Sequence, residues 1–205
     1  MHKEILNNKQ IELLPLISQF KREYYLVGGT AIALYLGHRR SIDFDLFKNS
    51  TIRHKKNVQK IKDFGFEPLI TRNVSEQMNL IVNEVKITFF EYPYPIEAIV
   101  FFEKIIKIPD LLDLAAMKAF ALGRRSKWKD YVDIFFLLKE KFTIKDISER
   151  AEKLFGDFFS EKLFRAQLIY FKDIDYTEDI DYMTSNPPTQ KEIQNFLIKL
   201  SSQIV

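Results

Sequence analysis

The stretch "YLVGGTAIALYLGHRRSIDFDLF", residues 25–47, carries the strongest structural signal in this chain. Its first residues are apolar and β-prone, which predicts a short buried strand that stops at two adjacent glycines. The next segment, "TAIALYLG", has the length and composition of a two-turn helix that ends at Gly37. "SIDFDLF" then alternates apolar and acidic residues, as a half-buried strand does. The stretch therefore predicts a strand, a helix and a second strand in succession.

Two acidic residues stand on the second predicted strand. Asp43 and Asp45 are two positions apart, so both carboxylates are expected on one face. The apolar residues that alternate with them, Ile42, Phe44 and Leu46, are expected to face the core. Two carboxylates at this separation repel each other unless a cation lies between them, and magnesium characteristically uses one or two protein carboxylates together with substrate phosphates. The pair therefore predicts a metal site with phosphate nearby.

The glycine pair offers a place for that phosphate. At a strand-to-helix turn, Gly28 and Gly29 let the backbone approach a ligand closely, and the helix that follows directs N–H groups and its positive dipole end at an anion. Thr30 adds a hydroxyl, and the basic residues 38–40, from which we select Arg40, supply charge toward a triphosphate. An isolated D-x-D is often surface decoration, and Gly-Gly is often a plain turn. Their order along the chain favours a site for a nucleoside triphosphate (NTP).

Composition limits the classes of protein that remain. With 205 residues, 46% of them hydrophobic, the chain can form one domain or two small ones that share an interface, and a disordered chain is excluded. A formal charge of +3 means that any affinity for nucleic acid must come from local patches. The absence of cysteine excludes disulfides and Cys-ligated zinc. Neither a signal peptide nor a long apolar run is visible, so we expect a cytoplasmic protein that does not bind membranes.

The pattern outside the opening stretch predicts a sheet followed by a helical half. An amphipathic helix precedes the first strand, a basic helix follows the second, three β-prone runs extend the sheet, and an edge strand or a loop comes after "YPYP". These segments are residues 3–20, 53–66, 67–72, 77–83, 85–92 and 98–108. The expected fold class is therefore α/β (α+β), a mixed sheet with packed helices. We expect an N-terminal α/β domain at residues 1–108 and a helical C-terminal domain at residues 109–205 that completes a cleft.

The C-terminal half carries helical periodicity from Pro109 onward. Helices are expected over residues 110–125, 127–142, 146–155, 161–171 and 190–204. The polar segment "KDIDYTEDIDYMTSNPP", residues 172–188, predicts one long surface loop. Its aspartates invite a calcium interpretation, but the segment lacks the glycine and the terminal glutamate of an EF-hand loop. A solvated loop is therefore favoured.

Three charged residues stand out on the first two of these helices. Lys118 lies in the middle of an otherwise apolar helix, so its ammonium is expected either to meet a phosphate or carboxylate or to extend to solvent at the helix edge. On the next helix, Asp130 and Asp133 are three positions apart and share a face. Asp130 also has Lys118, Arg124 and Arg125 as potential ion-pair partners.

Two segments together resemble a known family. "VGGTAIALYLGHRRSIDFDLF" is similar to the first motif of the nucleotidyltransferase superfamily, and specifically to AbiEii/AbiGii-type toxins of bacterial toxin–antitoxin and phage-abortive systems. "DLLDLAAMKAFALGRRSKWKDYVDIFFLL" is similar to the later segment of that family, in which a helical lysine is followed by basic residues and an R/K-D-x-x-D pattern. The resemblance covers residues 25–140.

The resemblance implies an activity and a set of site residues. It implies magnesium-dependent transfer of a nucleoside monophosphate, or of nucleotides, from an NTP to a hydroxyl, with two Mg²⁺ ions held by Asp43 and Asp45. Lys118 would lie on the triphosphate side, and Asp130 would order the basic groups of the active site. The implied acceptor is tRNA or another cellular target, and the implied partner is an antitoxin protein.

One position departs from the family pattern. Many polymerase-like nucleotidyltransferases carry a third carboxylate on a later strand, and the candidate strand here is "VKITFFEY", residues 85–92. Thr88 stands at the expected position, and Glu91 would lie on the opposite face unless a bulge intervenes. The departure keeps open a non-catalytic module that binds NTP or protein on the same scaffold. A second alternative, distinguished by its acceptor, is a nucleotidyltransferase that modifies small molecules, of the antibiotic-modifying kind.

Two further features have open interpretations. Lys56 and Lys60 lie on one face of the basic helix, where they either follow an RNA backbone or form an ordinary solvated surface. Trp128 is the one tryptophan, and we expect it to be a core or interface anchor rather than a platform for base stacking.

Overall fold

The computed structural model describes residues 1–122, 124–125 and 127–202. The chain divides into two compact units, an N-terminal unit, Met1–Asp110, and a C-terminal unit, Leu111–Val205. None of the helices within the described ranges combines the length and apolar character needed to cross a lipid bilayer.

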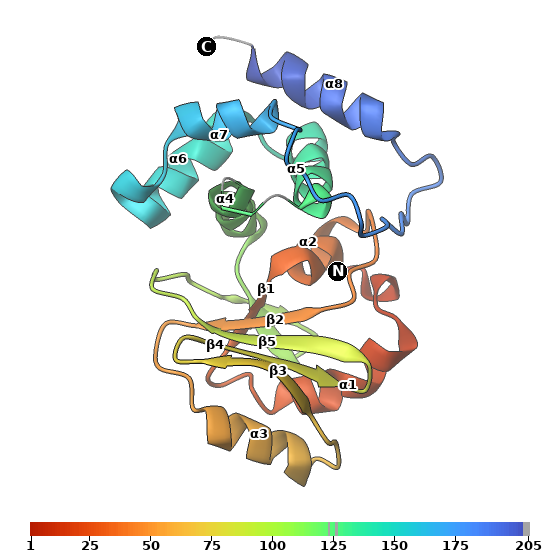
Figure 1. Cartoon of the computed structure of the whole chain (residues 1–205), viewed down its shortest axis with the longest axis vertical. Helices are drawn as coiled ribbons and strands as arrows, with labels where there is room; N and C mark the ends of the chain where they lie inside the picture. Colours follow the sequence, from red (N-terminus) through yellow and green to blue (C-terminus); the bar gives the residue numbers. More distant parts are fainter. Residues whose placement is uncertain (123, 126, 203–205) are drawn as a thin grey trace. The chain divides into compact units, whose positions relative to one another are not determined.

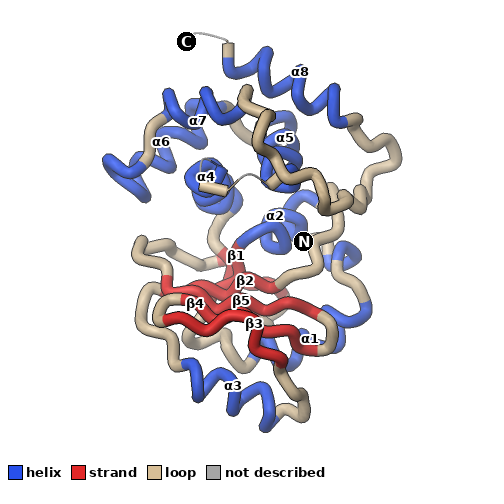
Figure 2. The backbone as a smooth tube through the Cα atoms, in the orientation of Figure 1, coloured by secondary structure: helices blue, strands red, loops and turns tan. Residues whose placement is uncertain are grey.

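A seven-stranded mixed sheet forms the centre of the N-terminal unit, in the order β3-β4-β5-β2-β1-β7-β6 (Figures 1 and 2). This sheet confirms the predicted α+β class. The strands are β1 (Tyr25–Val27), β2 (Phe44–Lys48), β3 (Leu69–Val74), β4 (Gln77–Val82), β5 (Val85–Glu91), β6 (Val100–Phe102) and β7 (Ile106–Ile108). The residues after "YPYP" form the hairpin β6–β7. Its first strand, β6, is an edge strand, which was one of the two expectations, and β7 pairs in parallel with β1.

The predicted strand, helix and strand are all present and lie at the middle of this sheet. β1 pairs antiparallel with β2, and β2 pairs in parallel with β5. Between β1 and β2 lies α2 (Gly28–Leu36), which ends at Gly37 as predicted. Gly37 has φ +67, a left-handed conformation that suits glycine at a helix C-terminus.

Helices cover both faces of the sheet. The helical segments of the N-terminal unit are η1 (Lys3–Ile5), α1 (Asn8–Ser18), α2 and α3 (His54–Asp63). In Figure 1, α1 and α3 lie on one face and α2 on the other. The chain after α1 anchors the first face, since the rings of Phe20 and Tyr24 pack edge-on against Phe89 of β5 at 4.9 and 5.1 Å. The face with α2 carries Asp45 of β2 together with Lys86 and Thr88 of β5.

The C-terminal unit is helical. Its elements are α4 (Leu111–Leu122), α5 (Trp128–Glu140), α6 (Ile144–Phe155), η2 (Gly156–Phe158), α7 (Glu161–Leu168) and α8 (Gln190–Ser201). A bidentate ion pair between Asp113 and Arg150 joins α4 to α6. The predicted last helix extends to residue 204, but residues 203–205 lie outside the described residues.

The predicted long loop lies between α7 and α8 and contacts the start of α5. Lys127 Nζ is 2.6 Å from Asp175 Oδ2, and the ring of Tyr176 lies 5.2 Å from that of Trp128. Trp128 is 7% exposed, which agrees with the prediction of a core anchor. The loop is therefore fastened by ion pairs and an aromatic contact, although most of its residues are solvated.

Candidate active site

The two aspartates lie where β2 begins. Asp45 is the second residue of β2 and pairs with Val27 of β1 and with Thr88 of β5, while Asp43 lies one residue before the strand. Residues paired across strands point to the same face. Lys86, two positions before Thr88, is on that face as well, and its Nζ is 3.9 Å from Asp43 Oδ2. One face of the sheet thus carries both carboxylates with a lysine beside them.

The expected burial of the alternate residues is correct for two of three. Phe44 and Leu46 are 1% and 0% exposed and face the core, as predicted. Ile42 is 61% exposed, so its predicted core position was wrong. The reason is local, because the chain has no strand structure at Ile42 and the alternation begins only at Phe44.

The glycine pair packs directly against the side chains of Asp45 and Arg39. Gly28 has φ +74, and a Cβ placed there would lie 2.2 Å from Asp45 Oδ2. A Cβ at Gly29 would lie 2.6 Å from Arg39 Nη2 and 3.0 Å from Ser41 Oγ. Only a residue without a side chain leaves room for the carboxylate and the guanidinium at these distances. At the N-terminus of α2, the backbone therefore lies close to a carboxylate and to a guanidinium.

The basic residues before β2 have different positions from those expected. Arg39 is 4% exposed, and it is the residue whose guanidinium lies against Gly29. Arg40, which we selected from the sequence, donates from Nη1 to the backbone oxygen of Glu4 at 3.1 Å. Both arginines are next to each other in the sequence, and no local pattern distinguishes them. The choice depends on how the segment after α2 returns to the sheet.

Thr30 has a structural contact that the sequence did not indicate. Its hydroxyl donates to the backbone oxygen of Asp43 and lies 2.9 Å from Ser41 Oγ. The side chain is buried, with 1% exposed. Thr30 therefore ties α2 to the segment that presents the aspartates, and its hydroxyl holds that segment in place.

The position of the third carboxylate is occupied by threonine. The β2–β5 register runs without a shift from Phe44 opposite Ile87 to Lys48 opposite Glu91. Thr88 therefore lies beside Asp45, and Glu91 lies beside Lys48 on the opposite face. The register excludes a bulge between Thr88 and Glu91 within this ladder.

A second polar cluster is buried inside the C-terminal unit. Lys118 Nζ on α4 lies 2.6 Å from Asp130 Oδ1 and 3.0 Å from Asp133 Oδ2 on α5. Arg125 donates to both oxygens of Asp130, from Nε at 2.8 Å and from Nη2 at 2.9 Å. The side chains of both aspartates are 0% exposed, and that of Lys118 is 3% exposed. We name these four residues the Lys118 cluster.

The charges of this cluster compensate one another. Burial by itself raises the pKa of the Asp130 carboxyl, but the positive charges of Lys118 and Arg125 outweigh burial and hold that pKa below its ordinary value. Asp130 is therefore ionised near neutral pH and orders two basic side chains. Of the three ion-pair partners that the sequence suggested for Asp130, the structure shows two, Lys118 and Arg125.

The lysines of α3 have an acidic partner. Lys56 and Lys60 approach Glu23 Oε1 at 3.4 and 3.1 Å. Burial raises the pKa of Glu23, and the two lysines more than offset this, so that its pKa is lowered. Part of their charge is thus compensated within the chain, which weakens the interpretation of α3 as an RNA-binding helix.

The N-terminal unit combines a mixed sheet, a glycine pair at the start of a helix, and two aspartates at the start of the neighbouring strand, which is the arrangement expected of a nucleotidyltransferase. MenT4, a nucleotidyltransferase toxin from Mycobacterium tuberculosis H37Rv, has a similar structure, with a TM-score of 0.61, 14% identity, and coverage of 96% of this chain and 84% of that one. A proposed nucleotidyltransferase from H. pylori superposes with a TM-score of 0.58 at 17% identity, covering 95% and 90% of the two chains.

Sequence comparison identifies the family. Residues 16–205 match the model of the family described as "Nucleotidyl transferase AbiEii toxin, Type IV TA system", and the chain belongs to this family. A relative from Aquifex aeolicus (strain VF5), the uncharacterized protein aq_aa25, is 27% identical over 200 residues, which are 85% of this chain and 84% of the relative.

Proposed function

We propose that this toxin-family nucleotidyltransferase is magnesium-dependent and moves a nucleoside monophosphate from an NTP to a hydroxyl of an RNA, with tRNA as the favoured acceptor. In this reaction the acceptor oxygen forms a bond to the α-phosphorus, the bond from that phosphorus to the bridging oxygen breaks, and pyrophosphate leaves with the electron pair. Such transfer depends mainly on positioning and on charge neutralisation. The residues of the N-terminal site are suited to both.

Asp43 and Asp45 would hold the magnesium. Over the described residues, His, Asp and Glu side chains do not gather in groups of three or more that would form a full protein cage. Two carboxylates on one face nevertheless fit magnesium, which completes its octahedral shell with phosphate and water oxygens. When bound, the metal neutralises the charge of the triphosphate. The two aspartates would contribute the negative charge that holds the magnesium beside α2.

The contact between Gly28 and Asp45 is the observation that carries the proposal. Because a Cβ at Gly28 would lie 2.2 Å from Asp45 Oδ2, the start of α2 and the metal-binding carboxylate occupy neighbouring space. Phosphates held by the N-terminus of α2 would then lie beside the aspartate that binds their metal. Arg39, against Gly29, adds a fixed positive charge at the same point.

Thr88 leaves the position beside Asp45 without a side chain that could take the proton of the acceptor hydroxyl. A threonine hydroxyl does not accept a proton near neutral pH, so the side chain beside Asp45 is no general base. The proton of the acceptor hydroxyl would pass to solvent or to a phosphate oxygen. This threonine is also the observation that favours a second candidate function, an NTP-binding module on the same scaffold that performs no transfer.

The C-terminal unit would contribute through the Lys118 cluster. We expect Asp130 to act as a positioning residue, because it contacts Lys118 and Arg125 directly. The contacts of Lys118 Nζ with Asp130 and Asp133 hold its ammonium inside this unit, and the phosphate contact expected of Lys118 stays a prediction. Family membership supports this role and supports an antitoxin protein as the partner that restrains the activity.

Incubation with each labelled NTP, magnesium and total RNA tests the activity. Label in RNA supports the proposal, label in small molecules or protein changes the acceptor class, and label in neither, with NTP still bound, supports the second candidate.

Asp43→Asn and Asp45→Asn test the site itself. In the absence of magnesium, each variant should be at least as stable as the wild type, because the repulsion between the two carboxylates is relieved. Each should also abolish the increase in melting temperature that magnesium with NTP gives the wild type. Asp63→Asn on α3 is the matched control and should keep that increase.

A further inference from the structure

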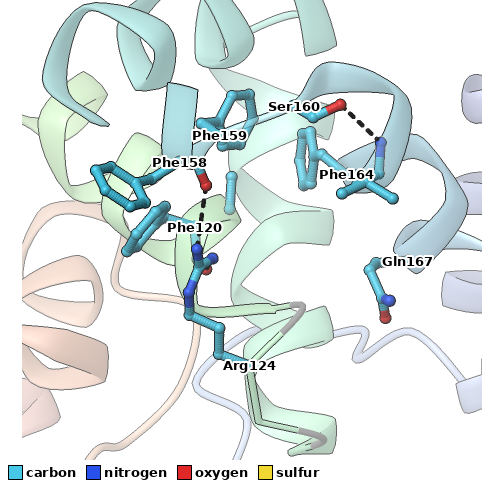
Figure 3. Close-up of a pocket in the computed structure, with 9 residues that line it drawn as sticks. Phe120, Arg124, Phe158, Phe159, Ser160, Phe164 and Gln167 are labelled. Atoms are coloured by element: carbon cyan, nitrogen blue, oxygen red, sulfur yellow. Dashed lines mark hydrogen bonds between the residues drawn. The ribbon is translucent and has the colours of Figure 1, made fainter. Parts of the chain in front are cut away.

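A cavity within the C-terminal unit lies outside the site described above. It has a volume of about 320 Å³ and is lined by residues of α4, η2 and α7 and of the segments that adjoin them. This volume falls at the lower end of the range for small-ligand pockets, about 300–1,000 Å³. Figure 3 shows its lining, which includes Phe120, Arg124, Phe158, Phe164 and Gln167. We name it the phenylalanine pocket.

Four of the nine residues that line the pocket are phenylalanines. Phe120 and Phe164 are buried, with 8% and 3% exposed, and they form the base of the pocket. Phe158 and Leu163 stand at its rim and are 71% and 65% exposed. Large apolar side chains that are exposed together beside a cavity are typical of a surface that binds a partner. Such a wall accepts a flat apolar ring.

Arg124 adds a fixed positive charge. Its Nη1 donates to the backbone oxygen of Phe120 at 2.6 Å, its Nη2 donates to that of Phe158 at 3.1 Å, and its guanidinium carbon lies 3.6 Å from the centroid of the Phe120 ring. These three contacts hold the guanidinium in one orientation. In Figure 3, Arg124 lies next to Phe120, and Gln167 lies across the pocket.

The surroundings of Arg124 differ from those of the other described arginines of this unit. Arg125, Arg150 and Arg165 pair with Asp130, Asp113 and Glu161 respectively. Among the residues that the structure describes, no carboxylate lies within 4.0 Å of the Arg124 guanidinium. Carbonyl oxygens orient its charge without neutralising it. An anionic group on a ligand would supply the missing negative charge.

We propose that the phenylalanine pocket binds one nucleotide of a single-stranded RNA, with the base among the rings and the adjacent phosphate at Arg124. Aromatic stacking with a nearby cation is the usual chemistry by which proteins hold single strands. The amide of Gln167 offers a donor and an acceptor to the edge of the base.

One guanidinium matches the single charge of a phosphodiester, whereas a triphosphate needs more positive charge or a metal. The inference therefore selects an RNA strand over a free NTP. It rests on the proposed function, for which it supplies a contact to the acceptor.

Binding of short fluorescent oligoribonucleotides, one for each base, tests the pocket by fluorescence anisotropy. Phe158→Ala should weaken binding roughly 5- to 100-fold through loss of stacking. Arg124→Met should weaken binding and reduce the slope of log affinity against log salt by about 0.7, the value for one phosphate of a single strand. Phe101→Ala and Arg22→Met, in the N-terminal unit, are the matched controls and should bind as the wild type does.

Phe158→Ala keeps the test independent of folding, since this side chain is largely exposed, whereas Arg124→Met removes two hydrogen bonds to the backbone. Equal binding by wild type and both pocket variants, or no binding by the wild type, overturns the inference. If mononucleotides bind as tightly as the oligonucleotides, the inference that the pocket binds an RNA strand rather than a free nucleotide is overturned. Binding of an acidic, phenylalanine-containing peptide in place of RNA would assign the pocket to a protein partner and overturn it as well.

The melting increase given by magnesium with NTP is measured on the same variants. It reports on Asp43 and Asp45, so both pocket variants should retain it. Its absence from the wild type contradicts the proposed function whatever the oligonucleotides do. Its presence, together with unaltered RNA binding by the pocket variants, contradicts only the pocket.

Discussion

Replacing Lys118 with methionine removes one of the two positive charges that compensate the buried carboxylates of α5. Methionine retains most of the apolar stem, so the main change is the loss of the ammonium from contacts of 2.6 and 3.0 Å. Asp130 keeps Arg125, whose side chain is half exposed, and Asp133 loses its contact with the ammonium of Lys118. Removing one partner of a buried ion pair costs about 3–5 kcal/mol, because a charge remains in an environment that solvates it poorly.

The stability lost in the Lys118→Met variant should depend on pH in a definite direction. The lowered pKa of Asp130 means that its stabilisation is present above the unfolded carboxyl pKa, about 3.9, and is lost as the pH falls through the folded value. Without Lys118, burial dominates and raises the pKa of the carboxylates. The variant then loses stability as the pH rises above about 3.9, so its deficit should be larger at about pH 7.5 than at about pH 5.

Urea unfolding at both pH values measures the deficit. Lys153→Met, an exposed position on α6, is the matched control and should change stability by less than about 0.5 kcal/mol. Adding Asp133→Asn to Lys118→Met restores the charge balance and should recover part of the loss. If Lys118→Met costs no more than the control, or if its deficit does not depend on pH, then the ammonium is not held as a buried ion pair and the reasoning is refuted.

Three further changes test the site and its surroundings. Gly28→Ala forces a methyl group against Asp45 and strains a left-handed backbone, so we expect a loss of about 1–3 kcal/mol and no melting increase with magnesium and NTP; an unchanged ligand response would argue against the phosphate site. Thr88→Asp should tighten magnesium binding, whereas Glu91→Gln should leave label transfer intact; an inactive, folded Glu91→Gln that still binds NTP would contradict the β2–β5 register. Glu23→Gln should cost about 0.5–1 kcal/mol near neutral pH and nothing once the pH falls below the lowered pKa of the wild-type carboxyl, which unfolding across pH will measure.

The order of elements around the active site was readable from the residues because the signals there are local. The glycines end β1 and open α2, Gly37 ends that helix with a positive φ, and period-two alternation marks β2. Each of these signals acts through the backbone of one residue or its immediate neighbours. The same holds for the β-prone runs and for the amphipathic helices that follow. Family resemblance carried by two motifs then indicated the nucleotidyltransferase class, which the comparisons confirm.

The contacts that shape the site required the folded chain. Adjacent arginines are equivalent in the sequence, yet Arg39 lies against Gly29 and Arg40 extends to the backbone of Glu4. Lys118 and its partners on α5 are twelve or more residues apart, and their pairing depends on how two helices pack. Side-chain direction and strand register are set by the burial of segments that are distant in the sequence. The free energy of that burial is spread over many residues, so no single position in the sequence shows a pattern that predicts it. For this reason the elements of the site were predictable from the sequence, and Lys118 and Arg125 were among the expected partners of Asp130, but the sequence did not determine which of the expected contacts form.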